Sequence, residues 1–178
     1  MKLFIDADSI MFKAACTQDT KHDTRVVTRK IIEDSIADCF ADEVYIAVKG
    51  KDNFRYNIYP DYKSSRKDKL EDKLKERLND AHAYLLKDWS AVQSDGMEAD
   101  DVIGYICSNL YPDSEKVIYS SDRDFIQLID DKITIWNPIK KMTQDEKWVE
   151  HEFGMSPKNY LIYRTMDGDK SDDIDGVK

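Results

Sequence analysis

The stretch Lys2-Leu3-Phe4-Ile5-Asp6 begins the chain with a short apolar run that ends on a carboxylate. A continuous apolar run of this length predicts a strand that is buried on both faces of a sheet. Three later segments repeat the pattern with β-branched and aromatic residues: Val44-Tyr-Ile-Ala-Val48, Val117-Ile-Tyr119 and Ile133-Thr-Ile-Trp136. We therefore expect core strands at these four positions.

Apolar residues at helical spacing lie between the predicted strands. They form three stripes: Ile32, Ile36 and Phe40; Leu70, Leu74, Leu78 and Leu85; and Val102, Ile103, Ile106 and Leu110. Strands that alternate with helices predict an α/β fold, with a central, mostly parallel, twisted sheet and helices on both faces. Because the chain has no internal repeat and no Pro/Gly-rich linker, residues 1–178 are predicted to form a single domain.

Cysteine usage and hydropathy limit the environment in which the protein works. Cys16, Cys39 and Cys107 are widely spaced and form no CxxC pair, which argues against a disulfide framework or a zinc site. Their apolar surroundings predict buried, unreactive thiols. Only three apolar residues precede Asp6, too few for a signal peptide, and no run approaches the roughly 18 residues of a membrane-spanning helix. We expect a soluble, cytoplasmic protein with no membrane partner.

The charge of the chain is unevenly distributed. The net charge of −9 by itself disfavours a nucleic-acid partner. Residues 49–69, however, hold seven basic and three acidic residues, so this segment is positive while the rest is strongly negative. The polar stretch 50–69 contains Tyr56, Tyr59 and Tyr62 and is broken by Pro60. It is predicted to be an exposed loop or mobile arch, which could grip a nucleic-acid strand or could be ordinary solvated surface.

Four short acidic clusters are spread along the chain: Asp6 with Asp8, residues 98–101, Asp122 with Asp124, and residues 167–173. The first three meet the end of a predicted strand or the start of a predicted helix, so a parallel sheet can bring them to one edge. Each cluster alone could be solvated surface or a helix cap, because 36 of the 178 residues are acidic. Together they predict a site for hard divalent metals that act on phosphate, because crowded carboxylates need cations to stay ionised.

Spacing within two clusters sharpens this prediction. Asp122 and Asp124 would lie on the same side of an extended segment if the strand continued past Ser121. Glu98 and Asp101 would share one face at the start of a helix.

Five ordered motifs give the chain a resemblance to the 5′-nucleases, a family of flap endonucleases, phage 5′–3′ exonucleases and the 5′-nuclease domain of bacterial DNA polymerase I. The motifs are Phe4-Ile-Asp6-Ala, Phe54-Arg55 with Tyr62-Lys63-Ser-Ser-Arg66, Glu98-Ala-Asp100-Asp101, Ser121-Asp122-Arg-Asp124, and Gly168-Asp169-Lys-Ser-Asp172-Asp173-Ile. The resemblance implies a PIN-like 5′-nuclease core that holds two or more Mg²⁺ or Mn²⁺ ions. The implied metal ligands are Asp6, Glu98, Asp100, Asp101, Asp122, Asp124, Asp169 and Asp172. It also implies that one ion generates hydroxide for attack on a phosphodiester and another stabilises the departing 3′-oxygen.

The same resemblance gives roles to the basic segment. It implies that Lys63 and Arg66 clamp the reacting phosphate, that a nearby base stacks on Tyr62, and that Arg55 helps to bind the substrate. The expected activity is that of a 5′–3′ exonuclease or flap endonuclease in DNA replication or repair, in a bacterial or phage-infected cell. The expected partner is DNA with a free 5′ end, a flap or an RNA–DNA hybrid.

The chain departs from the family pattern at two places. Val48 stands where the family usually has an aspartate, so one ligand of the first metal is missing. Asp8 could partly compensate, or it could cap a helix that begins near Ser9. The family also continues after its Gly-Val dipeptide into a helix-hairpin-helix element that grips duplex DNA, whereas this sequence stops at Lys178. We expect that element to be absent, or to be supplied by a partner such as a replication protein.

Two alternative functions fit part of the pattern. A haloacid-dehalogenase-like phosphatase would use Asp6 and Asp8, then Ser120, then Asp169 and Asp173, but it would leave residues 62–66 and 98–101 without a role. A non-catalytic nucleic-acid-binding module derived from a nuclease would fit the missing aspartate at position 48. Eight carboxylates kept close together would, however, repel one another in a fold that no longer needed metals.

Overall fold

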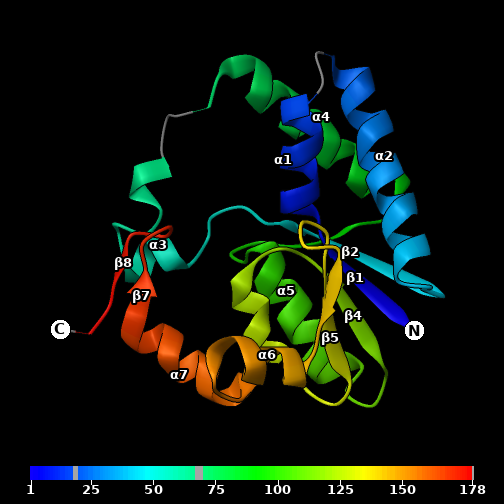
Figure 1. Cartoon of the computed structure of the whole chain (residues 1–178). Coiled ribbons are helices and arrows are strands. Elements are labelled where there is room, and N and C mark those ends of the chain that lie inside the picture. Colours follow the sequence, from blue (N-terminus) through cyan, green and yellow to red (C-terminus); the bar gives the residue numbers. More distant parts are fainter. Residues whose placement is uncertain (18–19, 67–69, 178) are drawn as a thin grey trace.

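A six-stranded sheet forms the centre of the molecule, which the computed structural model describes over residues 1–17, 20–66 and 70–177 (Figure 1). Its strands are β1 (Lys2–Asp6), β2 (Glu43–Lys49), β3 (Val92–Ser94), β4 (Lys116–Tyr119), β5 (Ile133–Asn137) and β6 (Met142–Gln144). They lie in the order β3-β2-β1-β4-β5-β6, and only β6 runs antiparallel to its neighbour. The predicted α/β fold with a mostly parallel sheet is confirmed.

Helices cover the sheet, and short turns connect the layers. The helices are α1 (Ala7–Thr17), α2 (Lys21–Asp38), α3 (Arg55–Ile58), α4 (Asp72–Asp88), α5 (Ala99–Tyr105), α6 (Glu146–Phe153) and α7 (Pro157–Asp167). Three short helical segments are η1 (Ser64–Arg66), η2 (Ile106–Leu110) and η3 (Arg123–Leu128), and β7 (Gly168–Asp169) and β8 (Ile174–Asp175) form a small antiparallel pair. Within the described residues, no helix combines the length and the apolar character needed to cross a membrane.

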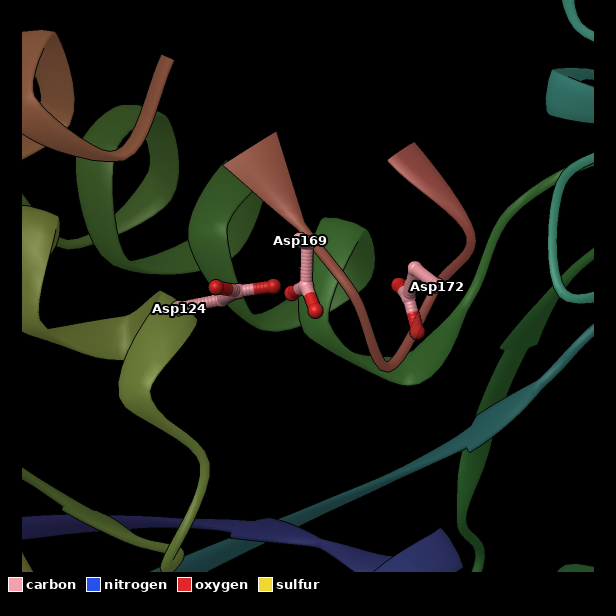
Figure 2. Close-up of side chains that lie close together, drawn as sticks. All are labelled: Asp124, Asp169 and Asp172. Carbon is pink, nitrogen blue, oxygen red and sulfur yellow. The ribbon is translucent and has the colours of Figure 1, made fainter. Parts of the chain in front are cut away.

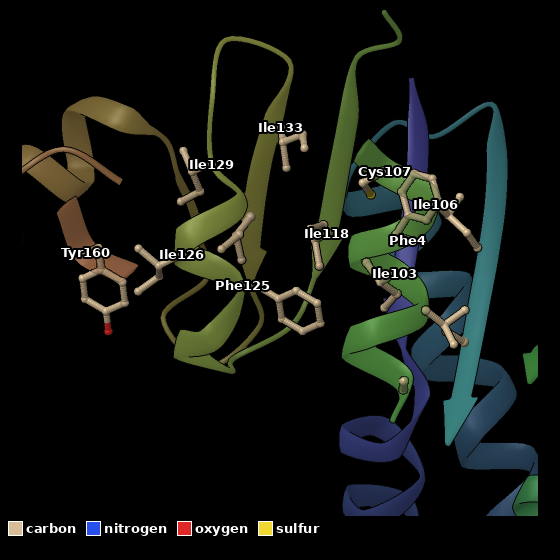
Figure 3. Packing of buried hydrophobic residues seen from close by; sticks show 14 of the residues in the cluster. Phe4, Ile103, Ile106, Cys107, Ile118, Phe125, Ile126, Ile129, Ile133 and Tyr160 are labelled. Atoms are coloured by element: carbon tan, nitrogen blue, oxygen red, sulfur yellow. The ribbon is translucent and has the colours of Figure 1, made fainter. Parts of the chain in front are cut away.

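The side chains of β1 alternate between two hydrophobic clusters, one on each face of the sheet. Leu3 and Ile5 pack with residues of α1, α2 and α4, whereas Phe4 packs with Ile103 of α5 and Phe125 of η3. Figure 3 shows the second cluster, which continues from Phe4 through η3 to α7. Because both faces are covered, β1 must be apolar on both sides, and this explains its continuous apolar run.

The order of the strands fixes where a ligand can approach. The chain leaves β1 for β2 on one side and later returns to β4 on the other, so the sheet reverses its direction of winding between β1 and β4. In open α/β sheets, this point lies at the carboxyl ends of the strands and leaves a crevice between the connections. Asp6 ends β1, and Asp122 follows β4 by three residues.

The structure corrects several expectations about individual elements. The short strands β3 and β6 were not predicted, because three residues carry too little periodicity to be recognised. The first predicted helical stripe, Ile32, Ile36 and Phe40, runs past the end of its helix. The helix α2 ends at Asp38, and Phe40 adopts a left-handed backbone (φ 50°) with 87% of its surface exposed. Leu70 precedes α4, and Leu110 is also exposed.

Two of the three cysteines behave as predicted. Cys39 and Cys107 are buried, and burial raises the pKa of each thiol to about 12. Cys16 is exposed on the outer side of α1, so the prediction of a buried thiol is wrong at this position. An apolar neighbourhood in sequence does not decide which side of a helix a side chain occupies.

Candidate metal centre

Asp6 is a buried carboxylate that caps α1. It accepts hydrogen bonds from the Asp8 backbone N–H at 3.2 Å and from the hydroxyls of Ser9 at 2.7 Å and Ser120 at 3.3 Å. Only 7% of the residue is exposed, and this burial raises the pKa of Asp6 above its ordinary value. Because α1 starts at Ala7, the expectation of a helix beginning near Ser9 with Asp8 as its cap is wrong.

Position 48 offers no oxygen ligand. Val48 is fully buried and packs with Leu3 and Ile5 in the cluster that faces α1, α2 and α4. Asp8 lies in the first turn of α1, where burial raises its pKa and its Oδ1 atom has no hydrogen-bond partner in the described structure. Whether Asp8 compensates for Val48 stays a prediction.

Asp122 and Asp124 are positioned by a turn and not by a strand. The strand β4 ends at Tyr119, Asp122 caps η3, and its carboxylate accepts the Asp124 backbone N–H at 2.9 Å. The strand therefore does not continue past Ser121, and the condition for both side chains to lie on one side of an extended segment is not met, since the Asp122 side chain hydrogen-bonds the backbone in place of a strand partner. Desolvation by the surrounding protein raises the pKa of Asp122, although the residue is exposed, and the nearby carboxylates of Asp6 and Asp172 raise it further.

The cluster at residues 98–101 opens α5. Glu98 is the N-cap, and Glu98 and Asp101 form a capping box in which the Glu98 N–H donates to Asp101 at 3.0 Å. Glu98 and Asp101, which were predicted to share one face, thus cap the N-terminus of α5. Asp100 projects from the same turn, and its pKa is raised to about 7 by partial burial and by the charges of Asp101 and Glu98.

Cations from the segment after β2 neutralise two of these carboxylates. Arg55 makes a bidentate ion pair with Asp101 at 2.6 and 2.7 Å, and the Lys63 ammonium lies 2.7 Å from Glu98 and 3.6 Å from Asp172. Burial alone would raise the pKa of Glu98 and of Asp101, but these cations hold each pKa below its ordinary value. The pairs connect the basic segment directly to the acidic site.

Lys63 itself has an unusual backbone. Its φ of 52° lies in the left-handed region that non-glycine residues rarely adopt, and its N–H donates to the Asp172 carbonyl at 2.9 Å. Such strain persists only where the surrounding contacts hold it, and it is frequent at functional sites. The backbone and the ammonium of Lys63 therefore both contact the C-terminal acidic segment.

The side chain of Tyr62 is largely buried, whereas its predicted role, stacking with a substrate base, needs an accessible ring. Only 4% of the residue is exposed, and its hydroxyl lies 2.7 Å from Glu98 and 3.1 Å from Asp172. The Lys63 ammonium lies 4.8 Å from the ring centroid, and the ring of Tyr56 packs against it edge-on. The backbone of Arg66 is in η1, whereas its side chain, together with Lys67 and Lys69, lies outside the described part of the structure.

Three carboxylates converge at the turn between β7 and β8. One oxygen each from Asp124, Asp169 and Asp172 lies within 4.8 Å of the others, and Figure 2 shows the three side chains close together. Gly168 enters this turn with φ 79°, and a Cβ there would lie 2.4 Å from the Gly176 nitrogen. Only glycine allows the two strands to approach so closely. Within the described ranges, no second set of three metal-ligand side chains comes as close together.

Arg164 is a site residue that the sequence analysis missed. It projects from the last turn of α7 to Asp169 and lies 3.1 Å from Asp124. Ser171 donates to Asp169 from both its N–H and its hydroxyl, and these bonds and Arg164 lower the pKa of Asp169 against the effect of burial. The signal available in the sequence was a basic residue one helical turn before the Gly-Asp motif, which also suits the helix dipole.

The donor set fits a hard divalent cation. Asp6, Asp100 and Asp122 have raised pKa values, and no ion pair to these three side chains is found among the described residues. Carboxylate oxygens are the ligands that Mg²⁺ and Mn²⁺ prefer. Burial first, and nearby carboxylates second, raise the three pKa values, and a bound cation would offset both by favouring the charged form. The fold and the site therefore define an α/β protein with a cluster of carboxylates at the carboxyl edge of its sheet, which is a candidate site for a divalent cation.

Comparisons with known proteins agree with this class. Residues 2–154 match the family described as 5′-3′ exonuclease, N-terminal resolvase-like domain. The 5′-3′ exonuclease of Mycoplasma pneumoniae is 34% identical over 137 residues, which cover 70% of this chain and 45% of the relative. Flap endonuclease Xni of Shewanella pealeana is 32% identical over 126 residues, covering 70% and 49%. The chain thus spans about half the length of the curated relatives it matches.

Solved structures share the fold. The flap endonuclease of bacteriophage T5, in a pseudo-enzyme-product complex with DNA and metal ions, gives a TM-score of 0.85 at 18% identity, covering 99% of this chain and 70% of that one. The bacteriophage T5 5′-exonuclease with divalent zinc ions bound gives 0.82 at 18% identity, covering 100% and 70%. This chain belongs to the 5′-3′ exonuclease N-terminal resolvase-like domain family. The membership decides against the haloacid-dehalogenase-like alternative.

Proposed function

We propose that this chain is a divalent-metal-dependent 5′-nuclease that hydrolyses phosphodiester bonds of DNA, or of RNA paired to DNA, near free 5′ ends or junctions. The observation that carries the proposal is the meeting of four distant acidic segments with the ammonium of Lys63 at one edge of the sheet. A cation site with a lysine at its rim suits a substrate that carries a phosphate. Membership in the exonuclease family and the fold shared with bacteriophage T5 enzymes support the same activity.

The carboxylates divide into two sets of candidate ligands. Asp124, Asp169 and Asp172 would hold one cation at the turn between β7 and β8. Asp6, Asp100 and Asp122, which have raised pKa values and no ion pair among the described residues, are the candidate ligands of a further cation. When bound, such cations supply a more acidic water and stabilise negative charge on the phosphate, as in two-metal hydrolases.

Lys63 would change its partner when the substrate binds. Its ammonium is now shared by Glu98 and Asp172, and a cation bound to those carboxylates would compete with it for their charge. The released ammonium would be able to donate to a phosphate oxygen and to stabilise the charge that develops there. Arg55 and Arg66 would bind the substrate on either side of Lys63 along the chain.

The proposed partner is DNA with a free 5′ end or a flap, as expected in replication or repair, and a replication protein would add further contacts to the duplex. The test is cleavage of duplexes labelled at the 5′ end, one blunt and one with a 5′ flap, in Mg²⁺, in Mn²⁺ and with a chelator. Products should appear only with metal and carry a 3′-hydroxyl. A protein that binds these DNAs but leaves them intact in both metals would instead be a non-catalytic binding module.

A further inference from the structure

A small pocket with polar walls lies between η3, the β5–β6 hairpin and α6, and its volume is about 180 Å³. The polar side chains that line it come from all three elements and from the residue before Asp122: Ser121, Arg123, Asn137, Lys140, Gln144 and Glu152. Asp122 lines the same pocket and is also a carboxylate of the acidic site. The pocket and the acidic site are therefore neighbours, and the proposed function gives the pocket no role.

Two buried amide side chains line this pocket with donors that the protein does not use. Asn137 is 6% exposed and Gln144 is 4% exposed. The Asn137 carbonyl oxygen accepts the backbone N–H groups of Ile139 and Lys140 at 3.0 Å each, which fixes the amide so that its NH₂ group remains a donor. Within the described ranges, neither this NH₂ group nor the Gln144 amide has a hydrogen-bond partner. Because buried polar groups are normally paired, these two amides point to a ligand from outside the chain.

Arg123 gives the pocket a positive charge. It is exposed, and it makes no ion pair in the part of the chain that the structure describes. The second cation, Lys140, is already shared, since its ammonium lies 3.7 Å from Glu152 and 4.8 Å from the ring centroid of Trp148. The charge of Glu152 is thus balanced within the pocket, and under the proposed function the charge of Asp122 is balanced by metal. The guanidinium of Arg123 is left for a ligand.

The size and the donors of the pocket favour a phosphate group. A volume of about 180 Å³ is smaller than the roughly 300–1,000 Å³ of pockets that enclose whole small molecules, so a complete nucleotide would not fit. Phosphate oxygens only accept hydrogen bonds, which suits a guanidinium and two amide NH₂ groups. Since Asp122 borders both the pocket and the acidic site, one nucleic acid could place two of its phosphates at the two positions.

We propose that this pocket binds a second phosphate of the substrate, near the one at the carboxylates, with Arg123 as the charged donor and Asn137 and Gln144 as neutral donors. The inference rests on the proposed function, because it takes a nucleic acid as the ligand of the acidic site. Two phosphates held at a set distance determine which bond of the strand reaches the carboxylates. The contact would position the strand without reading its bases.

The test is a set of binding measurements with a duplex that carries a 5′ flap, in Ca²⁺ in place of Mg²⁺. One phosphate at a time is replaced by an uncharged methylphosphonate. For the unmodified protein, one position other than the reacting phosphate should weaken binding about tenfold, the usual size of a hydrogen bond to a charged group. The same replacement should have little further effect on Arg123→Gln, because the charged donor is already gone. Arg123 is exposed, so this variant should fold normally.

Three further variants separate the donors from general charge. Arg123→Lys keeps the positive charge and should retain most of the methylphosphonate effect. Gln144→Met keeps the length of the side chain without its amide and should reduce the effect about threefold. Lys147→Gln is the matched control, since it removes an exposed cation of α6 that does not line the pocket. It should leave the methylphosphonate effect unchanged.

The inference is overturned if no position besides the reacting phosphate weakens binding, or if the effect persists undiminished in Arg123→Gln. Titration with inorganic phosphate, in chelator and without DNA, tests the other source of the same ligand. Binding of this ion that depends on Arg123, together with no methylphosphonate effect, would assign the pocket to free phosphate and overturn the strand contact.

Cleavage of the same flap duplex in Mg²⁺ separates this inference from the proposed function. A methylphosphonate effect that depends on Arg123, without any cleavage, would remove the nuclease activity and keep the pocket. Cleavage without such an effect would remove the pocket alone.

Discussion

Six carboxylates of the acidic site fall into two kinds, and their difference shows how the protein tolerates so much negative charge. Asp124 belongs to neither kind, because it contacts Arg164 and still has a pKa raised by burial. The paired carboxylates, Glu98, Asp101 and Asp169, each contact Lys63, Arg55 or Arg164, and each has a lowered pKa. The unpaired carboxylates, Asp6, Asp100 and Asp122, lack such partners in the described structure and have raised pKa values. The side-chain cations thus neutralise part of the site, and the remaining carboxylates are the ones that the proposed function assigns to metal.

The largest effect is expected from removing an unpaired carboxylate. Asp122→Asn should reduce metal-dependent cleavage on the order of a thousandfold, because it removes an oxygen ligand without a substitute. The fold should be retained, since the residue is exposed and belongs to no hydrophobic cluster. Single-turnover rates in Mg²⁺ check this, with Asp131→Asn, an exposed aspartate outside the site, as the control. Full activity of Asp122→Asn would contradict the assignment of Asp122 to the metal site.

A smaller loss of activity is expected from replacing Lys63, the cation that pairs with Glu98. Lys63→Met should lower the single-turnover rate at saturating metal about a hundredfold, because one donor to the reacting phosphate is lost. Lys51→Met is the matched control, since Lys51 lies in the same basic segment, is exposed and makes no ion pair among the described residues. An unchanged rate for Lys63→Met would show that this lysine only balances the charge of Glu98.

The pH dependence of stability separates the two kinds of carboxylate without metal. The folded state raises the pKa of Asp100 to about 7, so the folded protein binds this proton more tightly than the unfolded chain does. The resulting stabilisation is complete below the ordinary pKa and is lost as the pH rises towards 7. Asp100→Asn should therefore stabilise the metal-free protein by about 2 kcal/mol at pH 8, allowing for solvent screening, and have little effect at pH 4.

Urea unfolding in chelator at the two pH values measures this difference. Asp113→Asn, an exposed aspartate for which no effect is expected, is the control. Equal stability of Asp100→Asn and the unmodified protein at pH 8 would mean that burial and the neighbouring charges do not raise the pKa of Asp100, and the comparison between the two kinds of carboxylate would fail.

The smallest effect is expected from replacing Arg164, the residue of α7 that forms ion pairs with Asp124 and Asp169. Arg164→Gln should destabilise the metal-free protein by about 1 kcal/mol, because Asp124 and Asp169 lose their shared counter-ion. Saturating Mn²⁺ should remove most of this loss, since a bound cation would neutralise the same carboxylates. Thermal unfolding with and without Mn²⁺ tests the expectation against Arg25→Gln, which breaks a remote ion pair with Asp80. A loss that is independent of Mn²⁺ for Arg164→Gln would show that Arg164 is purely structural.

Much of the fold could be predicted from the sequence because its signals are local. The core strands around Phe4, Ile46 and Ile118 are continuous apolar runs, and both faces of each must be covered. The ends of elements were harder to predict. The apolar spacing that includes Phe40 continues past the point where the chain turns into a left-handed conformation, because spacing alone contains no information about a cap.

The candidate site likewise contains residues that could be recognised in the sequence and residues that could not. The acidic motifs and Lys63 stand out in the sequence by composition and order, whereas Arg164 does not, because its partners lie 40 and 5 residues away on other elements. The enclosure of Tyr62 and the exposure of Tyr59 were equally invisible. Both depend on how residues 54–62 fold back against the C-terminal turn.

The sequence by itself determined the alternating α/β fold, the positions of the acidic clusters and the basic segment between them, because periodicity, composition and motif order are properties of a single chain. Only the tertiary structure decided which carboxylates pair with a lysine or arginine, which three lie close enough together to share one ion, and which polar side chains line the pocket beside Asp122. These properties depend on distance and desolvation between segments far apart in sequence. They arise only when the sheet, the segment after β2 and the C-terminal turn are packed together.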